Sequence, residues 1–69
     1  MTRDIKNLPY NIYKFRTERK LTHEELAELL GVSVRIIYDY ENGKKTPKLT
    51  TLFDLSIILQ TTLDELISK

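Results

Sequence analysis

Residues 22–43 read THEELAELLGVSVRIIYDYENG, and this stretch decides the fold. It opens with a capping box, in which the side chains of Thr22 and Glu25 satisfy free backbone amides at the start of a helix. Gly31 follows the apolar positions of that helix and suits the left-handed conformation in which many helices end. We therefore predict a helix over residues 22–30 that stops at the glycine.

A second helix is predicted to begin directly after this glycine turn. Ser33 belongs to the preferred helix-start residues, and Gly43 supplies a stop, which together predict a helix over residues 33–42. Ile37 and Tyr40 lie three positions apart and are expected to face inward. Two helices joined by a three-residue turn that contains glycine form a helix-turn-helix unit, in which the second helix can enter the major groove of DNA.

The rest of the chain repeats the helical pattern. Apolar residues recur at intervals of three and four rather than two, which indicates helices. Pro9 suits the first turn of a helix, and Thr62 with Glu65 forms a second capping box. We predict one all-α domain with a central helix-turn-helix. Its five helices are expected over residues 9–19, 22–30, 33–42, 49–59 and 62–67. Residues 1–8 are expected to form an N-terminal arm or to add a turn around Ile5 and Leu8.

Length and composition exclude several classes of function. A chain of 69 residues suffices for one domain, and without cysteine it has no disulfide or thiolate metal site. His23 is the one histidine. We therefore expect no metal, cofactor or small-molecule ligand, and with no Ser-His-Asp set and no glycine-rich phosphate loop we expect no enzyme. No apolar stretch approaches the roughly 18 residues that span a bilayer, so a cytoplasmic protein without a membrane partner is expected.

Positive charge is concentrated in two blocks, although the formal net charge is only +1. Residues 1–20 carry six Lys and Arg against two acids, and the stretch KKTPK at 44–48 carries three lysines and no acid. Acidic residues prevail between the blocks. A fold can bring both blocks to one side, as in nucleic-acid-binding domains, or leave them as two solvated patches.

Four segments at fixed spacing give a more specific indication: ELAELLGVS, IYDYENGK, PKLTTL and LDEL. They resemble the helix-turn-helix domain of the phage-repressor and Cro-like group, the XRE family, over residues 10–67. The resemblance implies a five-helix, lambda-repressor-like domain. It also implies a transcriptional regulator that binds double-stranded DNA and thus the nucleoid, expected here to be a repressor that binds a palindromic operator as a homodimer. The alternative is an antitoxin or co-regulator whose main partner is a protein, which the low net charge favours.

The resemblance assigns base readout to the outward face of the second helix of this unit. Its residues are Val34, Arg35, Tyr38 and Asp39. The guanidinium of Arg35 fits the O6 and N7 atoms of guanine, although Arg35 can equally pair with Asp39 in solvent. Val34 can pack on a thymine methyl group, and Tyr38 can reach a phosphate or the groove wall. This face is sparser in polar side chains than is usual in the family.

Phosphate contacts are expected from both helix starts and from the basic loop. The residues are Thr22, His23, Ser33, Lys44, Lys45 and Lys48. His23 stands where the family often has glutamine, and it can donate a hydrogen bond to phosphate or simply face solvent.

Three further expectations concern structure. Arg16 and Glu41 match a salt bridge between the first and third helices, with contact between Arg16 and DNA as the alternative. Ile57, Leu63 and Ile67 are candidates for a dimer interface; Ile57 and Leu29 are apolar where the family is usually polar, which can also be incidental. Gln60 replaces a common glycine after the fourth helix, so we expect a left-handed residue there at a cost of up to about 1 kcal/mol.

Overall fold

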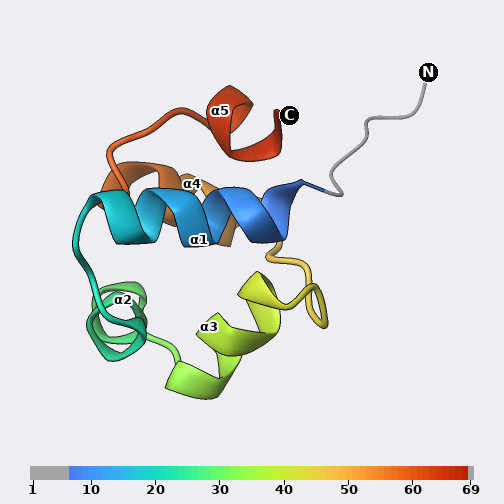
Figure 1. Cartoon of the computed structure of the whole chain (residues 1–69). Helices are drawn as coiled ribbons and strands as arrows, with labels where there is room; N and C mark the ends of the chain where they lie inside the picture. The colour runs from blue at the N-terminus through green and yellow to red at the C-terminus, as the bar shows by residue number, and fades with distance from the viewer. Residues whose placement is uncertain (1–6, 69) are drawn as a thin grey trace.

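The computed structural model describes residues 7–68. These residues form the helices α1 (Leu8–Glu18), α2 (His23–Leu30), α3 (Val34–Glu41), α4 (Leu49–Ile58) and α5 (Leu63–Ile67). In Figure 1, α1 lies across the middle with α4 behind it, α5 lies above, and α2 and α3 lie below. The all-α prediction is confirmed, and every helix bound falls within one residue of its expected position.

The N-terminal boundary differs from the prediction in one respect. Leu8 was expected in the arm or in an added turn, and it begins α1 and is only 3% exposed. Burial of the Leu8 side chain favours the earlier helix start, and Pro9 fits the first turn, where a backbone amide would have no partner within the helix. Residues 1–6 of the predicted arm lie outside the described residues.

The helix starts follow the capping signals. Thr22 Oγ1 accepts a hydrogen bond from the Glu25 amide at 3.0 Å, and Glu25 Oε1 accepts one from the Thr22 amide at 2.8 Å. Thr62 and Glu65 repeat this exchange at the start of α5. These caps satisfy backbone donors that a helix cannot satisfy itself, so short local motifs set where α2 and α5 begin. By contrast, α1 and α4 begin without a side-chain cap.

One shared core holds the helices together. Its fully buried side chains are Ile12, Leu26, Ile37, Leu55, Leu59 and Leu66. Each such residue contributes about 1.5–3 kcal/mol relative to an exposed position. The helices have 5 to 11 residues, and isolated helices this short are marginal in water, so their stability comes from this core. None of the helices in residues 7–68 is long and apolar enough to cross a membrane.

A buried asparagine fixes α5 against α1. Asn11 is 5% exposed, and its Nδ2 donates to the carbonyl oxygens of Leu66 at 2.8 Å and Ser68 at 2.6 Å. The last carbonyls of a helix have no partner within the helix, so Asn11 acts as a distant C-terminal cap. A helix of five residues is thereby secured at both ends.

The fourth helix ends in a left-handed residue, as expected. Gln60 has φ +55°, and the amide of the following Thr61 donates to the Ser56 carbonyl at 2.9 Å. Lys20 adopts the same conformation after α1, with φ +59°. A side chain in this region costs roughly 1–2 kcal/mol, which glycine avoids.

The substitution Gln60→Gly is expected to stabilise the domain by up to about 1 kcal/mol. Glycine removes the strain at φ +55° but adds conformational freedom to the unfolded chain, which returns part of the gain. Equilibrium urea unfolding measures the difference, with the exposed helical position Thr50→Gly as a control that should lose stability. A loss of stability in Gln60→Gly would contradict the prediction.

Candidate nucleic-acid interface

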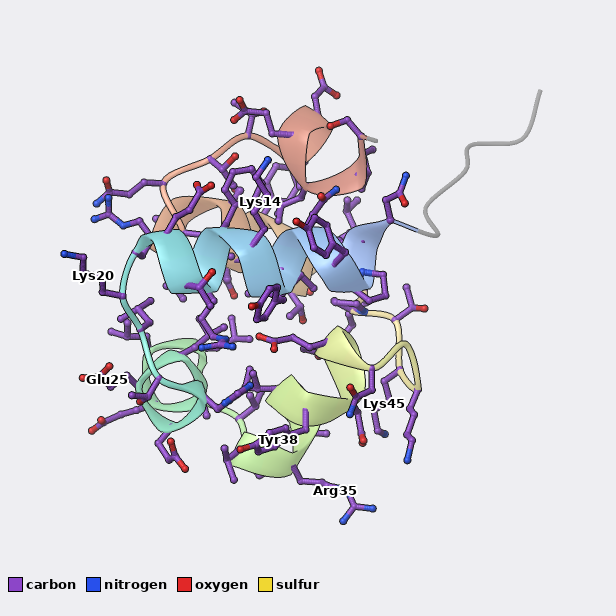
Figure 2. All side chains as sticks on the ribbon, in the orientation of Figure 1. Lys14, Lys20, Glu25, Arg35, Tyr38 and Lys45 are labelled. Carbon is purple, nitrogen blue, oxygen red and sulfur yellow. The ribbon has the colours of Figure 1, made fainter. Side chains whose placement is uncertain are left out.

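The helix α3 is held along one stripe and free along the other. Ile37 and Tyr40 are buried in the core, and α3 contacts both α1 and α2. On the opposite face, Arg35 extends away from the body of the protein (Figure 2). A helix that is anchored on only one face leaves its other face available to a groove about 12 Å wide.

Arg35 and Asp39 form a loose pair on this outer face. Arg35 Nε lies 3.7 Å from Asp39 Oδ1, which is too long for a hydrogen bond. The Arg35 side chain is 80% exposed, whereas that of Asp39 is 14% exposed. The guanidinium can therefore leave this pair at little cost, and Asp39 is the less accessible member of the pair.

The inner end of α3 is fixed by a buried carboxylate. Arg16 Nε donates to Glu41 Oε2 at 2.6 Å, and Arg16 Nη2 donates to Oε1 at 3.3 Å, with both side chains 8% exposed. The third nitrogen, Nη1, donates to the Leu21 carbonyl at 2.7 Å. The guanidinium thus joins α1, the α1–α2 loop and α3, and its donors point into the protein rather than toward a ligand.

His23 lies between this carboxylate and the outer face. Its Nε2 is 3.1 Å from Glu41 Oε1, and its ring stacks on Tyr38 with centroids 4.2 Å apart and planes 21° apart. The sequence placed His23 at a phosphate or in solvent, and neither interpretation anticipates this contact between α2 and α3. Positions 23 and 38 are brought together only by the packing of the two helices.

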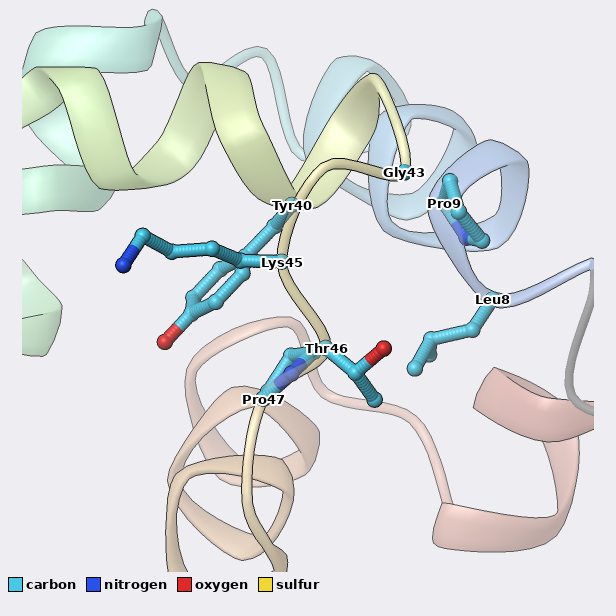
Figure 3. A pocket seen from close by; sticks show the side chains of 7 residues that line it. All are labelled: Leu8, Pro9, Tyr40, Gly43, Lys45, Thr46 and Pro47. Atoms are coloured by element: carbon cyan, nitrogen blue, oxygen red, sulfur yellow. The ribbon is translucent and has the colours of Figure 1, made fainter.

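The basic loop is tied to α3 through its backbone. The amides of Lys44 and Lys45 donate to the Asp39 carbonyl at 2.8 and 3.2 Å, while the side chains of Lys44, Lys45 and Lys48 are exposed. Figure 3 shows the Lys45 side chain directed away from Pro9, at a hollow of about 280 Å³. The loop is therefore fixed in position while its ammonium groups remain available.

The two helix N-termini differ in their suitability for phosphate. At α2, the Thr22 hydroxyl is used by the capping box, and Glu24 and Glu25 place negative charge in the first turn. At α3, Ser33 accepts from the Ile36 amide at a longer 3.4 Å, and the first turn carries no acid. Since the partial positive charge of a helix start attracts anions and nearby carboxylates oppose this, the start of α3 is electrostatically less unfavourable for an anion than the start of α2.

A family model described as helix-turn-helix matches residues 12–66. The chain belongs to the helix-turn-helix family. An uncharacterized HTH-type transcriptional regulator from Bacillus subtilis (strain 168), YqaE, is 37% identical over 57 residues, which are 83% of this chain and 49% of the relative. The HTH-type transcriptional activator BcrR from Enterococcus faecalis is 40% identical over 57 residues, or 83% of this chain and 28% of the relative. The chain thus spans about half or less of these curated relatives.

Solved structures share the arrangement of the helices. A crystal structure of apo-HppE superposes with a TM-score of 0.85 and 26% identity, over 97% of this chain and 37% of the other. The hypothetical transcription factor NHTF from Neisseria gives a TM-score of 0.82 and 23% identity, over 96% of this chain and 74% of the other. An HTH_3 family transcriptional regulator from Vibrio cholerae gives a TM-score of 0.79 and 22% identity, over 91% of this chain and 35% of the other. These likenesses support the five-helix fold.

On this helix-turn-helix domain, the candidate dimer residues fall into two places. Ile57 is 73% exposed and, with Leu29 at 58%, lines a groove of about 310 Å³ between α2 and α4. Leu63 and Ile67 are half-buried on α5, and Ile67 packs against the core. The two apolar departures from the family pattern, at positions 29 and 57, therefore lie together on one surface.

Proposed function

We propose that this chain is the DNA-binding domain of a transcription regulator and that α3 reads the major groove of double-stranded DNA. The observation that carries the proposal is the free outer face of α3, with the guanidinium of Arg35 80% exposed beyond it. Membership in the helix-turn-helix family and the regulator names of YqaE and BcrR support it.

We assign base contacts to the outer face of α3 and phosphate contacts to the basic loop that follows it. Arg35 is proposed to donate two hydrogen bonds to guanine, with Val34 and Tyr38 beside it against the groove. The exposed ammonium groups of Lys44 and Lys45 are proposed to bind the backbone, since their loop is tied to the same helix. Because few side chains can reach bases, most of the affinity should come from phosphate contacts and should fall as salt rises.

We propose that two copies bind one palindromic operator and act as a repressor by occupying a promoter. Half-sites would lie about 34 Å apart, one turn of the double helix, because a two-fold dimer matches a palindrome. Two copies bound at a promoter would prevent RNA polymerase from binding there, which is the simplest way for such a complex to repress transcription. The relative BcrR is named an activator. A promoter-reporter assay therefore decides whether this protein lowers or raises transcription.

The surface proposed for the second copy is an apolar stripe on α4. Leu49, Phe53 and Ile57 recur every four residues along this helix and are 62%, 50% and 73% exposed. In an antiparallel pair of α4 helices with a two-fold axis at Phe53, Leu49 of one copy faces Ile57 of the other. The stripe is therefore self-complementary, as an interface between identical subunits requires.

The same stripe favours a second candidate function, an antitoxin or co-regulator module that binds another protein. Low net charge agrees with this alternative. A monomer that shows no duplex binding at low salt, yet forms a stable complex with a co-encoded protein, would support the alternative over the proposed function.

Substitution of Arg35 and Lys45 should separate base readout from backbone binding. On a duplex selected from a random pool, Arg35→Ala is expected to cost about 1–3 kcal/mol and to relax preference at one base pair. Lys45→Ala is expected to weaken binding to all duplex sequences alike. It should also reduce the slope of the logarithm of the binding constant against the logarithm of salt concentration by about one unit. Gel-shift titrations across salt concentrations measure both effects.

Lys14→Ala, on the opposite side of the protein from α3 (Figure 2), is the control. Unchanged site preference in Arg35→Ala would remove Arg35 from base readout.

A charge in the α4 stripe should prevent dimer formation. Ile57→Glu places a carboxylate at a position that is 73% exposed in the single chain, so it should leave folding intact while breaking the apolar contact between copies. Sedimentation equilibrium should show a dimer for the unaltered protein and a monomer for the variant. The change Glu28→Gln at another exposed position should leave the dimer intact, and a dimer in Ile57→Glu would exclude this surface.

A further inference from the structure

His23 is held on two sides by groups of very different exposure. On one side lies the Glu41 carboxylate, 8% exposed and bound to Arg16; on the other lies the ring of Tyr38, which is 42% exposed. The imidazole itself is 26% exposed. It therefore links a buried and fixed ion pair to an aromatic side chain on the outer face of α3.

The contacts of His23 leave little freedom to its ring. The hydrogen bond from Nε2 to Glu41 Oε1 at 3.1 Å fixes the direction of the imidazole, and both the neutral ring with its proton on Nε2 and the charged ring can donate it. The face of the ring lies on the face of Tyr38, with centroids 4.2 Å apart. The imidazole therefore lies against one face of the Tyr38 ring.

Tyr38 shares its side of α3 with another apolar residue. Val34 precedes it by four positions, so the two side chains are neighbours on the helix surface. Val34 is half-buried and packs against the core, so Tyr38 is the more accessible of the two side chains next to Arg35. In the major groove, the 5-methyl group of thymine is the apolar feature that a base offers to such side chains.

We propose that His23 is a positioning residue that determines specificity: it holds the Tyr38 ring beside Val34 so that the pair reads the 5-methyl group of a thymine. The proposal rests on the proposed duplex-binding function and adds to it the base chemistry that is read. It also replaces the phosphate contact expected for His23, because Nε2 is engaged with Glu41 and the first turn of α2 carries two glutamates.

Three variants separate the hydrogen bond of His23 from its stacking. His23→Phe keeps an aromatic ring without the hydrogen bond, His23→Gln keeps a donor without the ring, and His23→Ala keeps neither. The ring protons of Tyr38 report the stack directly in the NMR spectrum of the free protein, since an aromatic ring at 4.2 Å shifts them upfield. Amide dispersion shows whether each variant is folded.

The expected result is an upfield shift of the Tyr38 ring protons in the unaltered protein and in His23→Phe, and its loss in His23→Gln and His23→Ala. Unchanged Tyr38 shifts in a folded His23→Gln would overturn the positioning role. This measurement needs no DNA, so it stands even if the proposed function fails.

The methyl readout is tested on a duplex selected from a random pool, with each thymine replaced in turn by deoxyuridine. Loss of one buried methyl group should weaken binding about fourfold at one position for the unaltered protein and for His23→Phe. His23→Gln should bind the thymine and deoxyuridine duplexes equally. The proposal would be overturned if the unaltered protein bound the thymine and deoxyuridine duplexes equally. It would also be overturned if His23→Gln preferred the thymine duplex as strongly as the unaltered protein does. Absence of any duplex binding would instead reject the proposed function.

Discussion

The arrangement of this domain depends on one buried carboxylate. Glu41 lies at the end of α3, receives two hydrogen bonds from Arg16 of α1 and contacts His23 of α2. A buried charge is costly unless it is paired and hydrogen-bonded, so the three helices must keep their relative positions for it to remain satisfied. The apolar core stabilises the fold, and this network restricts the orientation that α3 adopts within it.

Fixing the inner side of α3 leaves its outer side free to bind. The Asp39 carbonyl accepts the amides of Lys44 and Lys45, so the basic loop keeps a constant position relative to the helix that carries Arg35. The groups proposed to read bases and to bind phosphates are thus attached to one rigid element. Such preorganisation lowers the entropy lost on binding, which matters in a domain with few groups that can contact bases.

Local signals in the sequence predicted the fold well, and contacts between distant segments were predicted less completely. Capping boxes and helical spacing predicted the five helices, and the resemblance to the family, which commonly has glycine at this position, predicted the left-handed Gln60. Packing decided the rest. Leu8 joins the core rather than the arm, Asn11 caps carbonyls 55 and 57 positions away, and His23 meets Tyr38. A single sequence holds no local pattern for such contacts, because they depend on how the helices pack.

Urea unfolding of Glu41→Gln tests the central role of the carboxylate most directly. The variant keeps the shape of the side chain but removes its charge, which leaves the guanidinium of Arg16 buried without a counter-charge. We predict a loss of about 3–5 kcal/mol in the free energy of unfolding, whereas the exposed Glu28→Gln should change it by less than about 0.5 kcal/mol. Equal stabilities of the two variants would contradict the account.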